Sequence, residues 1–217
     1  MKEALRIVLR REEERDYRRM EEVYRRAFWN VNVPGCNEHY LAHILRKHAD
    51  YLPELDYVAE LDGQLVGGVM YSRSSLTDEA GETQDIVTFG PIGVEPAYQR
   101  RGISRRLLEK TFDVARDMGY GAIVIFGNPD NYVARGFKSC MKYNVCVGDG
   151  VFPAAMMVKE LVPDFFDGRR YVFKDSTAFE SDAAAEAEFD KGFEPMEKKE
   201  LPCQEEFFIH CHSVLRP

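Results

Sequence analysis

The sequence predicts an α/β protein with a mixed central sheet, and two segments carry this prediction. A strand over residues 85–94, a helix over about 104–118 and an apolar strand over 123–126 follow one another, which is typical of a β-α-β unit with parallel strands. The dipeptide Asp62-Gly63 separates two further strand-like runs and predicts an antiparallel hairpin. Parallel and antiparallel pairs in one sheet make it mixed.

The first fifty residues predict a strand and two helices. Leu5, Ile7 and Leu9 alternate with their neighbours, as in a short strand with one buried face. Residues 17–27 show helical spacing of apolar side chains, and residues 41–48 repeat it after a break at Pro34-Gly35. We expect this second, shorter helix to end near residue 50.

The strand over 85–94 contains a break of its own. Gly90-Pro91 interrupts it, and because proline has no backbone N–H to donate, we expect sheet pairing to fail at this point. Downstream, residues 143–147 and 155–161 are expected to form an antiparallel hairpin at the sheet edge. From about Ser176 the chain becomes acidic and alanine-rich, which predicts a surface extension with one short helix. Phenylalanines along this extension indicate that it folds back on the domain.

Composition and charge exclude several functional classes. The 217 residues are 45% hydrophobic, which is enough for a sizeable core, and the formal net charge of −8 argues against nucleic acid as a partner. No apolar run approaches a membrane span, and the N-terminal residues have no leader-like apolar region. The five cysteines form no Cys-x-x-Cys pair and suit reduced thiols, so we expect a cytoplasmic protein.

Residues 92–104 predict a phosphate-binding loop. They comprise a strand end, a proline-marked turn, an arginine-rich loop with one glycine, and the start of a helix. The first N–H groups of a helix lack intrahelical partners and carry partial positive charge, so they can seat phosphate oxygens. Arg100, Arg101, Arg105 and Arg106 crowd this helix start, where each exposed cation costs roughly 0.3–1 kcal/mol. An anionic ligand is expected to compensate.

Two motifs in this chain resemble those of one family. Gln99-Arg-Arg-Gly102-Ile-Ser104 is similar to the Gln/Arg-x-x-Gly-x-Gly/Ala signature for acetyl-CoA in the GCN5-related N-acetyltransferase (GNAT) superfamily, with Ser104 in the final small position. Gly127-Asn-Pro-Asp-Asn-Tyr132-Val-Ala-Arg-Gly136-Phe137 is similar to the Tyr-x-x-x-Gly-Phe element of that family, and its Gly-Asn-Pro start to one predicted bacterial subgroup. The resemblance covers roughly residues 1–160.

The resemblance implies a GNAT fold with splayed parallel strands, flanking helices and a C-terminal extension, divided as a domain over 1–160 and an extension over 161–217. It implies an acetyltransferase that uses acetyl-CoA and no metal, and that acts on an amine of a small molecule or a protein. Tyr132 would be the general acid, although it could instead be a packing residue, and the Val94 N–H would stabilise the oxyanion. The implied cofactor contacts are Ile92, Gly93, Val94, Gln99, Arg100, Arg101, Gly102, Ile103, Ser104, Arg105, Asn128 and Tyr132.

The general base is left open by the sequence. Where histone-acetylating members of the family carry a strand glutamate, this chain has Thr88. Asp85 is the nearest acid on that strand and is our candidate, against the alternative of a solvated carboxylate. Glu38 and His39 could line the acceptor site or cap a helix. The acceptor itself would be chosen by the loops around residues 29–40.

Two other functions are compatible with parts of the sequence. An acyl-CoA-binding sensor without catalysis is the main alternative, because the strand glutamate is missing. A different nucleotide-binding α/β protein ranks last, since neither Gly-x-Gly-x-x-Gly nor Gly-x-x-x-x-Gly-Lys-Ser/Thr occurs. His210-Cys211-His212, taken as a strand, offers only two ligands on one side, so no metal site is expected. The apolar C-terminal strands could mediate a homodimer.

Overall fold

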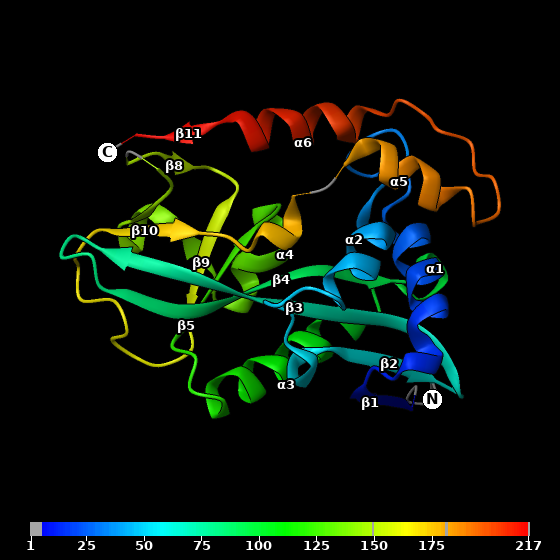
Figure 1. Ribbon diagram of the computed structural model, residues 1–217, viewed down its shortest axis with the longest axis horizontal. Helices are drawn as coiled ribbons and strands as arrows, with labels where there is room; N and C mark the ends of the chain where they lie inside the picture. The colour runs from blue at the N-terminus through cyan, green and yellow to red at the C-terminus, as the bar shows by residue number, and fades with distance from the viewer. Residues whose placement is uncertain (1–5, 149, 181, 217) are drawn as a thin grey trace.

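A mixed sheet forms the centre of the protein. The structure, a computed structural model, describes residues 6–148, 150–180 and 182–216. The main path of the sheet runs β1-β2-β3-β4-β5-β9-β6, with β10 and β7 attached at the end of β3. Figure 1 shows α3 on one face of the sheet and α1 and α2 on the other. The mixed α/β architecture predicted from the sequence is confirmed; Leu5 of the predicted first strand lies outside the described residues.

The N-terminal half follows the sequence closely. Strands β1 (Ile7–Arg11), β2 (Tyr57–Leu61) and β3 (Gln64–Asp78) are antiparallel neighbours. Asp62 and Gly63 both have positive φ, at 51° and 78°, as a two-residue hairpin turn requires. Helix α1 (Tyr17–Phe28) matches its prediction. Helix α2 (Glu38–Leu45) ends five residues before the expected position, because residues 46–49 continue only as turns.

The predicted β-α-β unit is present, and its strands diverge. Strand β4 (Thr83–Val94) leads through a loop into α3 (Ile103–Asp117) and then β5 (Ala122–Phe126). Strands β4 and β5 are parallel, but their described register contains the single pair Val87 and Ile123. The ladder between β3 and β4 also shifts register beside Gly90-Pro91, as expected. The carboxyl ends of β4 and β5 therefore separate.

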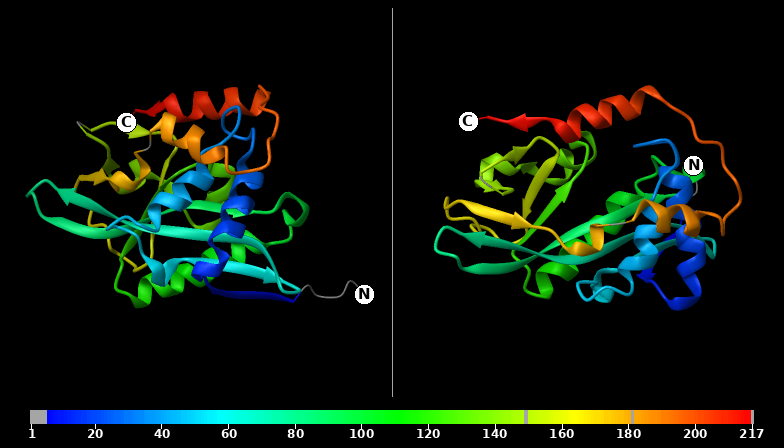
Figure 2. Two further views of the ribbon diagram at one scale, coloured as in Figure 1. Left: turned by 45° about the vertical axis from the view of Figure 1, so that its right-hand side comes forward. Right: turned by 45° about the horizontal axis from the view of Figure 1, so that its top comes forward.

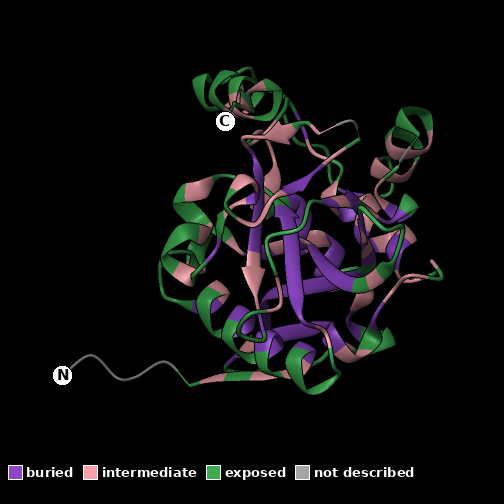
Figure 3. Ribbon diagram, turned by 90° about the vertical axis from the view of Figure 1, so that its left-hand side faces the viewer, coloured by how far each residue is buried: buried purple, intermediate pink, exposed green. Residues whose placement is uncertain are grey.

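Each face of the sheet has its own core. The larger cluster lies between the sheet and α3, and Figure 3 shows the buried strands at the centre of the molecule. A second cluster joins α1 and α2 to β2 and β3, and a third lies where β10 curls over β5 and β9. The alternation along β3 and β4 places Val87 and Phe89 on the α3 side and Ile86 on the opposite side. Burial of these apolar side chains positions the ends of β4 and β5.

The expected hairpin of residues 143–147 and 155–161 is wrong. Strand β9 (Met156–Glu160) lies between β5 and β6 (Lys138–Ser139). Strand β7 (Val145–Cys146) instead pairs in parallel with β10 (Tyr171–Lys174). Successive side chains of β9 point to opposite faces of the sheet, and those of Met156, Met157 and Val158 are all buried. Burial on both faces suits an interior strand, and β9 is one.

The C-terminal extension holds two helices, where the sequence predicted one. Helices α5 (Ala183–Asp190) and α6 (Pro202–His212) are followed by β11 (Val214–Leu215), which pairs with β8 (Phe152–Pro153). Figure 2 shows α6 lying along the outside of the molecule. Residues 210–212 end a helix, so the strand alternation assumed for His210-Cys211-His212 is wrong. Within the described ranges no group of side chains could hold a metal ion.

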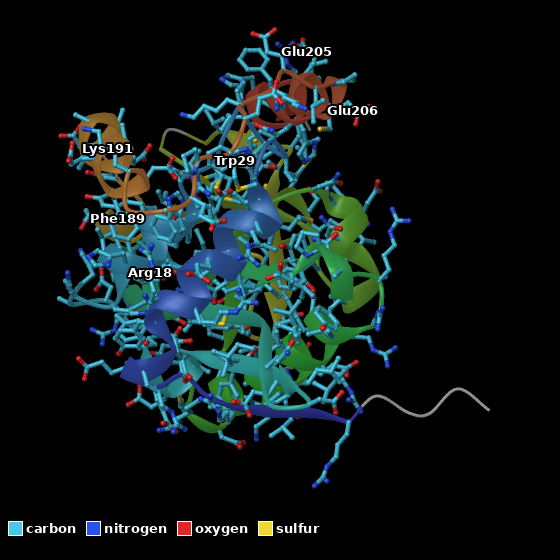
Figure 4. The ribbon with its side chains drawn as sticks, turned by 90° about the vertical axis from the view of Figure 1, so that its right-hand side faces the viewer. Arg18, Trp29, Phe189, Lys191, Glu205 and Glu206 are labelled. Carbon is cyan, nitrogen blue, oxygen red and sulfur yellow. The ribbon has the colours of Figure 1, made fainter. Side chains whose placement is uncertain are left out.

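The extension packs on α1, as its phenylalanines predicted. Arg25 donates to the Asp190 carboxylate at 2.7 Å and to the Glu194 carbonyl at 2.9 Å. The Arg18 guanidinium lies 3.6 Å from the centre of the Phe193 ring. Figure 4 shows Arg18 and Trp29 on the side of α1 that this segment follows, and Glu205 and Glu206 on the outer side of α6. Strand β10, from the same extension, completes the sheet.

None of the helices described here has the length and apolar character needed to cross a membrane.

Candidate active site

A cavity of about 410 Å³ lies where β4 and β5 diverge. It is enclosed by the end of α1, the carboxyl end of β4, the start of α3 and the short helix α4 (Pro129–Tyr132). Its lining residues are Ala27, Phe28, Val31, Ile92, Gly93, Val94, Tyr98, Gln99, Arg100, Gly102, Ile103, Ser104, Arg105, Leu108, Asn131, Tyr132 and Arg135. The structure therefore brings together all predicted cofactor residues except Arg101 and Asn128.

The loop before α3 presents backbone donors to this cavity. Gly102 adopts φ of +79° as the N-cap of α3, and open space surrounds it, so the backbone conformation is what requires glycine. The first helical hydrogen bond runs from the Arg106 N–H to the Gly102 carbonyl. The N–H groups of residues 103–105 precede it and have no intrahelical partner. They form a site for anionic oxygens at the cavity wall.

The end of β4 directs a second donor toward the cavity. The Glu95 N–H donates to the Val66 carbonyl of β3 at 2.8 Å. Because N–H groups alternate between the two edges of a strand, the Val94 N–H points away from β3, toward the side on which β5 has separated. The Val94 carbonyl points the same way and accepts a bond from Gln99 Nε2 at 3.1 Å, which fixes the loop to the strand.

Gly93 allows α1 to form the opposite wall. A Cβ atom at this position would lie 2.9 Å from Tyr24 Cδ1 and 3.2 Å from the Ala27 Cβ. The first contact is closer than a Cβ atom tolerates and the second is tight, so glycine at residue 93 allows α1 to approach β4 this closely. Ala27, Phe28 and Val31 thereby reach the cavity.

Arginines surround the cavity from two sides. Arg100 and Arg105 line it from the loop and α3, whereas the Arg101 guanidinium lies over the Tyr98 ring, 5.4 Å from its centre. Arg135, which the sequence analysis missed, lines the wall from the α4 side, and its Nε is a buried donor without a partner among the described residues. An unpartnered buried donor costs about 1–3 kcal/mol, which an anionic ligand would recover.

Tyr132 lines the cavity from the end of α4. Its ring packs against Phe89 and Phe137, with ring centres 5.6 and 5.8 Å away, and lies so close to Gly127 that a Cβ there would be 2.7 Å from Cε2. Burial raises the pKa of Tyr132 to about 12, so the phenol is protonated at neutral pH. Both expectations for Tyr132 fit this geometry, because its ring packs and it also lines the cavity.

Three predicted site residues lie elsewhere. The Asp85 side chain is 61% exposed and faces Arg73 at 3.8 Å. It precedes Ile92 by seven residues, roughly 23 Å along the strand, and does not line the cavity. Asn128 caps α4 by accepting the Asp130 N–H at 3.0 Å, and Arg101 stacks on Tyr98. These three residues make other contacts and do not line the cavity, and their predicted roles stay predictions.

Glu38, His39 and Thr88 offer no base at the cavity. The Glu38 carboxylate accepts the Asn37 N–H at 3.2 Å at the start of α2, a helix whose N-cap residue makes no side-chain cap bond. His39 is buried against α5, with Nε2 3.1 Å from Asp190, and burial lowers its pKa to about 4. Thr88 is buried on the sheet face opposite α3 and bonds to Ser74 at 2.8 Å.

Comparison with known proteins identifies a family and relatives that this chain resembles in sequence. Residues 12–140 match the acetyltransferase (GNAT) family. YhbS of Escherichia coli, described as an uncharacterized N-acetyltransferase, is 32% identical over 130 residues, which are 59% of this chain and 74% of YhbS. YjhQ of Escherichia coli, described in the same way, is 27% identical over 108 residues, 50% of this chain and 56% of YjhQ.

Solved structures agree with this comparison. The crystal structure of YhbS in complex with CoA has a TM-score of 0.70 and 27% identity, and the match covers 83% of this chain and 96% of YhbS. A GNAT family acetyltransferase from Brucella melitensis in complex with acetyl-CoA has a TM-score of 0.62, with 80% and 97% covered; at 23% identity it supports the fold alone.

These matches confirm the family, the GNAT fold and the acyltransferase class predicted from the two motifs. The family match spans more than half of the chain and includes the diverging strands, the loop before α3 and Tyr132. The chain belongs to the acetyltransferase (GNAT) family.

Proposed function

We propose that the protein transfers an acetyl group from acetyl-CoA to a primary amine at the cavity beside β4. The observation that carries the proposal is the convergence of three groups on one cavity: the free N–H groups at the start of α3, the Val94 N–H and the Tyr132 side chain. Support comes from YhbS, whose crystal structure is described as a complex with CoA.

The residues present fit acetyl-CoA. The N–H groups of residues 103–105, with Arg100 and Arg105, would hold the pyrophosphate, and the unpartnered Nε of Arg135 would gain an anionic acceptor. The unpaired edge of β4 at residues 92–94 would bind the amide-containing arm of acetyl-CoA, since strand edges bind extended chains through backbone hydrogen bonds.

Acetyl-CoA, when bound, supplies an acetyl group activated as a thioester. The Val94 N–H would donate to the carbonyl oxygen as that oxygen gains charge. Tyr132 would hold a proton for the departing sulfur. Because the pKa of Tyr132 is about 12, transfer of its proton to a thiolate of pKa about 8.5 is uphill by roughly 5 kcal/mol. The charge of Arg135 lowers the pKa of Tyr132 against the effect of burial and so reduces this cost.

Binding is tested by thermal denaturation with acetyl-CoA, with NAD as the comparison ligand. At 100 times its dissociation constant, acetyl-CoA is expected to stabilise the protein by about 2.7 kcal/mol, a shift of roughly 5–11 °C. Gly102→Glu would place a carboxylate among the loop N–H groups and abolish the shift. Gly119→Glu is the matched control, because Gly119 also has positive φ and open space but lies outside the cavity.

Transfer is tested by CoA release with a panel of amines. Acetylation of at least one amine, lost in Gly102→Glu and kept in Gly119→Glu, is the expected result. If acetyl-CoA binds and no amine, peptide or aminoglycoside is acetylated, the second candidate, an acyl-CoA sensor, is favoured. The observation that favours the sensor is Thr88. Its hydroxyl is bonded to Ser74, and β4 has no carboxylate at this position. Absence of a shift at millimolar acetyl-CoA would contradict both.

A further inference from the structure

A carboxylate that the cavity does not use lies on the sheet face opposite α3. Asp175 directly follows β10, which pairs with β3 from Tyr171 opposite Asp78 to Lys174 opposite Ser75. Continuing this register by one residue places Asp175 beside Ser74. Side chains alternate along a strand, so Asp175 shares the face of Phe173, which belongs to the core on that side.

The same face leads along β4 to the cavity. Ser74 bonds to Thr88 at 2.8 Å, so both hydroxyls lie on the Asp175 side of the sheet. Gly90 follows Thr88 on this face and directly precedes the part of β4 that lines the cavity from residue 92. An acceptor approaching from this side would therefore reach the diverging strands from the face opposite α3.

The segment from Phe173 to Phe179 contacts both diverging strands. The Phe173 ring lies 6.0 Å from the ring of Phe126 at the end of β5. A Cβ atom at Gly90 of β4 would lie 3.4 Å from the Phe179 ring. Asp175 is two residues from Phe173, a distance of at most about 7 Å along the chain. Figure 1 shows this segment crossing the face of the sheet between β10 and α5.

Asp175 is partly buried and forms no ion pair with any described residue. Its carboxylate accepts the Ser176 N–H at 2.9 Å, and burial raises its pKa to about 6. Lys174 beside it is exposed and points to the other face of the strand. A partly buried carboxylate without a cation is costly, so this position suits a ligand that brings the cation.

The titratable groups that face this segment from the turn after α2 are already paired. Asp50 accepts the Ser176 hydroxyl at 2.8 Å. His48 lies between Asp50, at 3.6 Å, and the Thr177 hydroxyl, at 3.2 Å. The side of the segment toward β5 is apolar instead, because Phe126 is 47% exposed there beside the Phe173 ring. Aromatic faces of this kind attract ammonium groups and pack on apolar stems.

We propose that Asp175 binds the ammonium group of the acceptor and accepts its proton, and that the acceptor is a primary amine on an apolar stem packed against Phe126 and Phe179. This inference rests on the proposed acetyl transfer. One N–H bond of the ammonium breaks, an O–H bond forms at Asp175, and that proton leaves to solvent. A C–N bond then replaces the C–S bond. Tyr132 gives its proton to sulfur and regains the proton that the nitrogen loses.

The test is the pH dependence of kcat/KM for Asp175→Asn, measured with alkyl and arylalkyl primary amines. In the native protein, kcat/KM is expected to fall below an inflection near pH 6, where Asp175 becomes protonated. Asp175→Asn should lose this inflection and about 10²–10⁴ in kcat/KM, with unchanged acetyl-CoA binding. His48→Gln should keep the inflection, which separates Asp175 from the nearby histidine.

Two controls make the result decisive. Asp113→Asn makes the same change at a side chain 68% exposed on α3 and should leave kcat/KM and its pH profile unaltered. The acetyl-CoA thermal shift, measured on the same samples, shows that each variant is folded and keeps its cofactor site. An inflection that persists in Asp175→Asn, or kcat/KM within twofold of the native value, would overturn the inference. A native protein that binds no acetyl-CoA would overturn the proposed function instead.

Discussion

Replacing Asp175 with asparagine is expected to stabilise the protein at neutral pH. Asparagine has the same shape and can still accept the Ser176 N–H, but it carries no charge. Burial raises the pKa of Asp175 to about 6, compared with about 3.9 in an unfolded chain. The folded state therefore binds this proton more tightly, and ionising Asp175 in the folded protein reduces its stability.

The sign and size of the effect follow from this pKa difference. Below pH 4 the carboxyl is neutral in both states, so the native protein and the variant should have equal stability. Between pH 4 and 6 the native protein loses stability, and above pH 6 the loss is complete. A difference of about two pKa units corresponds to up to roughly 3 kcal/mol, or about 6–12 °C in Tm for a chain of this length.

The assay is urea denaturation of both proteins at pH 4, 5, 6, 7 and 8. The difference in unfolding free energy should grow from near zero at pH 4 to a plateau above pH 6, in favour of the variant. Asp113→Asn serves as the control and should change stability by less than about 1 kcal/mol at every pH, as for an exposed ion pair. Equal stability of native protein and Asp175→Asn at pH 8, or a less stable variant, would refute the reasoning.

Three further substitutions test other parts of the structure. Tyr132→Phe should lower kcat by about 10²-fold or more while the acetyl-CoA thermal shift is kept; unchanged turnover at every pH would exclude the general-acid role. Gly93→Ala should destabilise the protein by about 1–3 kcal/mol in urea denaturation, because its Cβ would lie 2.9 Å from Tyr24. Arg25→Met should remove the ion pair to the Asp190 carboxylate and speed proteolytic cleavage within residues 191–201, with cleavage at the native rate as the contrary outcome.

The parts of the fold predicted from the sequence are those set by local rules. Asp62-Gly63 specifies a hairpin through its own backbone conformation, and the spacing of apolar residues specifies α1 and α3. The loop before α3 could be recognised because its glycine, arginines and helix start are adjacent in the chain. Within the cavity, this locality explains why ten predicted cofactor residues are lining residues.

The parts that failed depend on contacts between distant segments. Strand β9 is interior because β6 pairs on its far side, and nothing in residues 155–161 distinguishes this from an edge hairpin. Helix α6 has no buried residue. Its sequence therefore lacks the periodic apolar stripe of a packed helix, and this stripe is the signal from which a helix is predicted. Arg135 reaches the cavity only because α4 returns beside β4. A signal did exist for this residue, since it lies inside the second motif.

Side chains that act together on a sheet are harder to predict from the sequence than the strands that carry them. On β4, Asp85 is the acid nearest to the loop, yet its side chain is exposed on the α3 face of the sheet. Asp175 is ninety residues later, and only the pairing of β10 with β3 gives it a place on the face that leads to Gly90. Neighbouring strands of a sheet can be remote in sequence, so side chains that lie next to each other on one face often come from distant segments of the chain. With Asp175 as the acceptor carboxylate, the base of this reaction comes from the extension that completes the sheet.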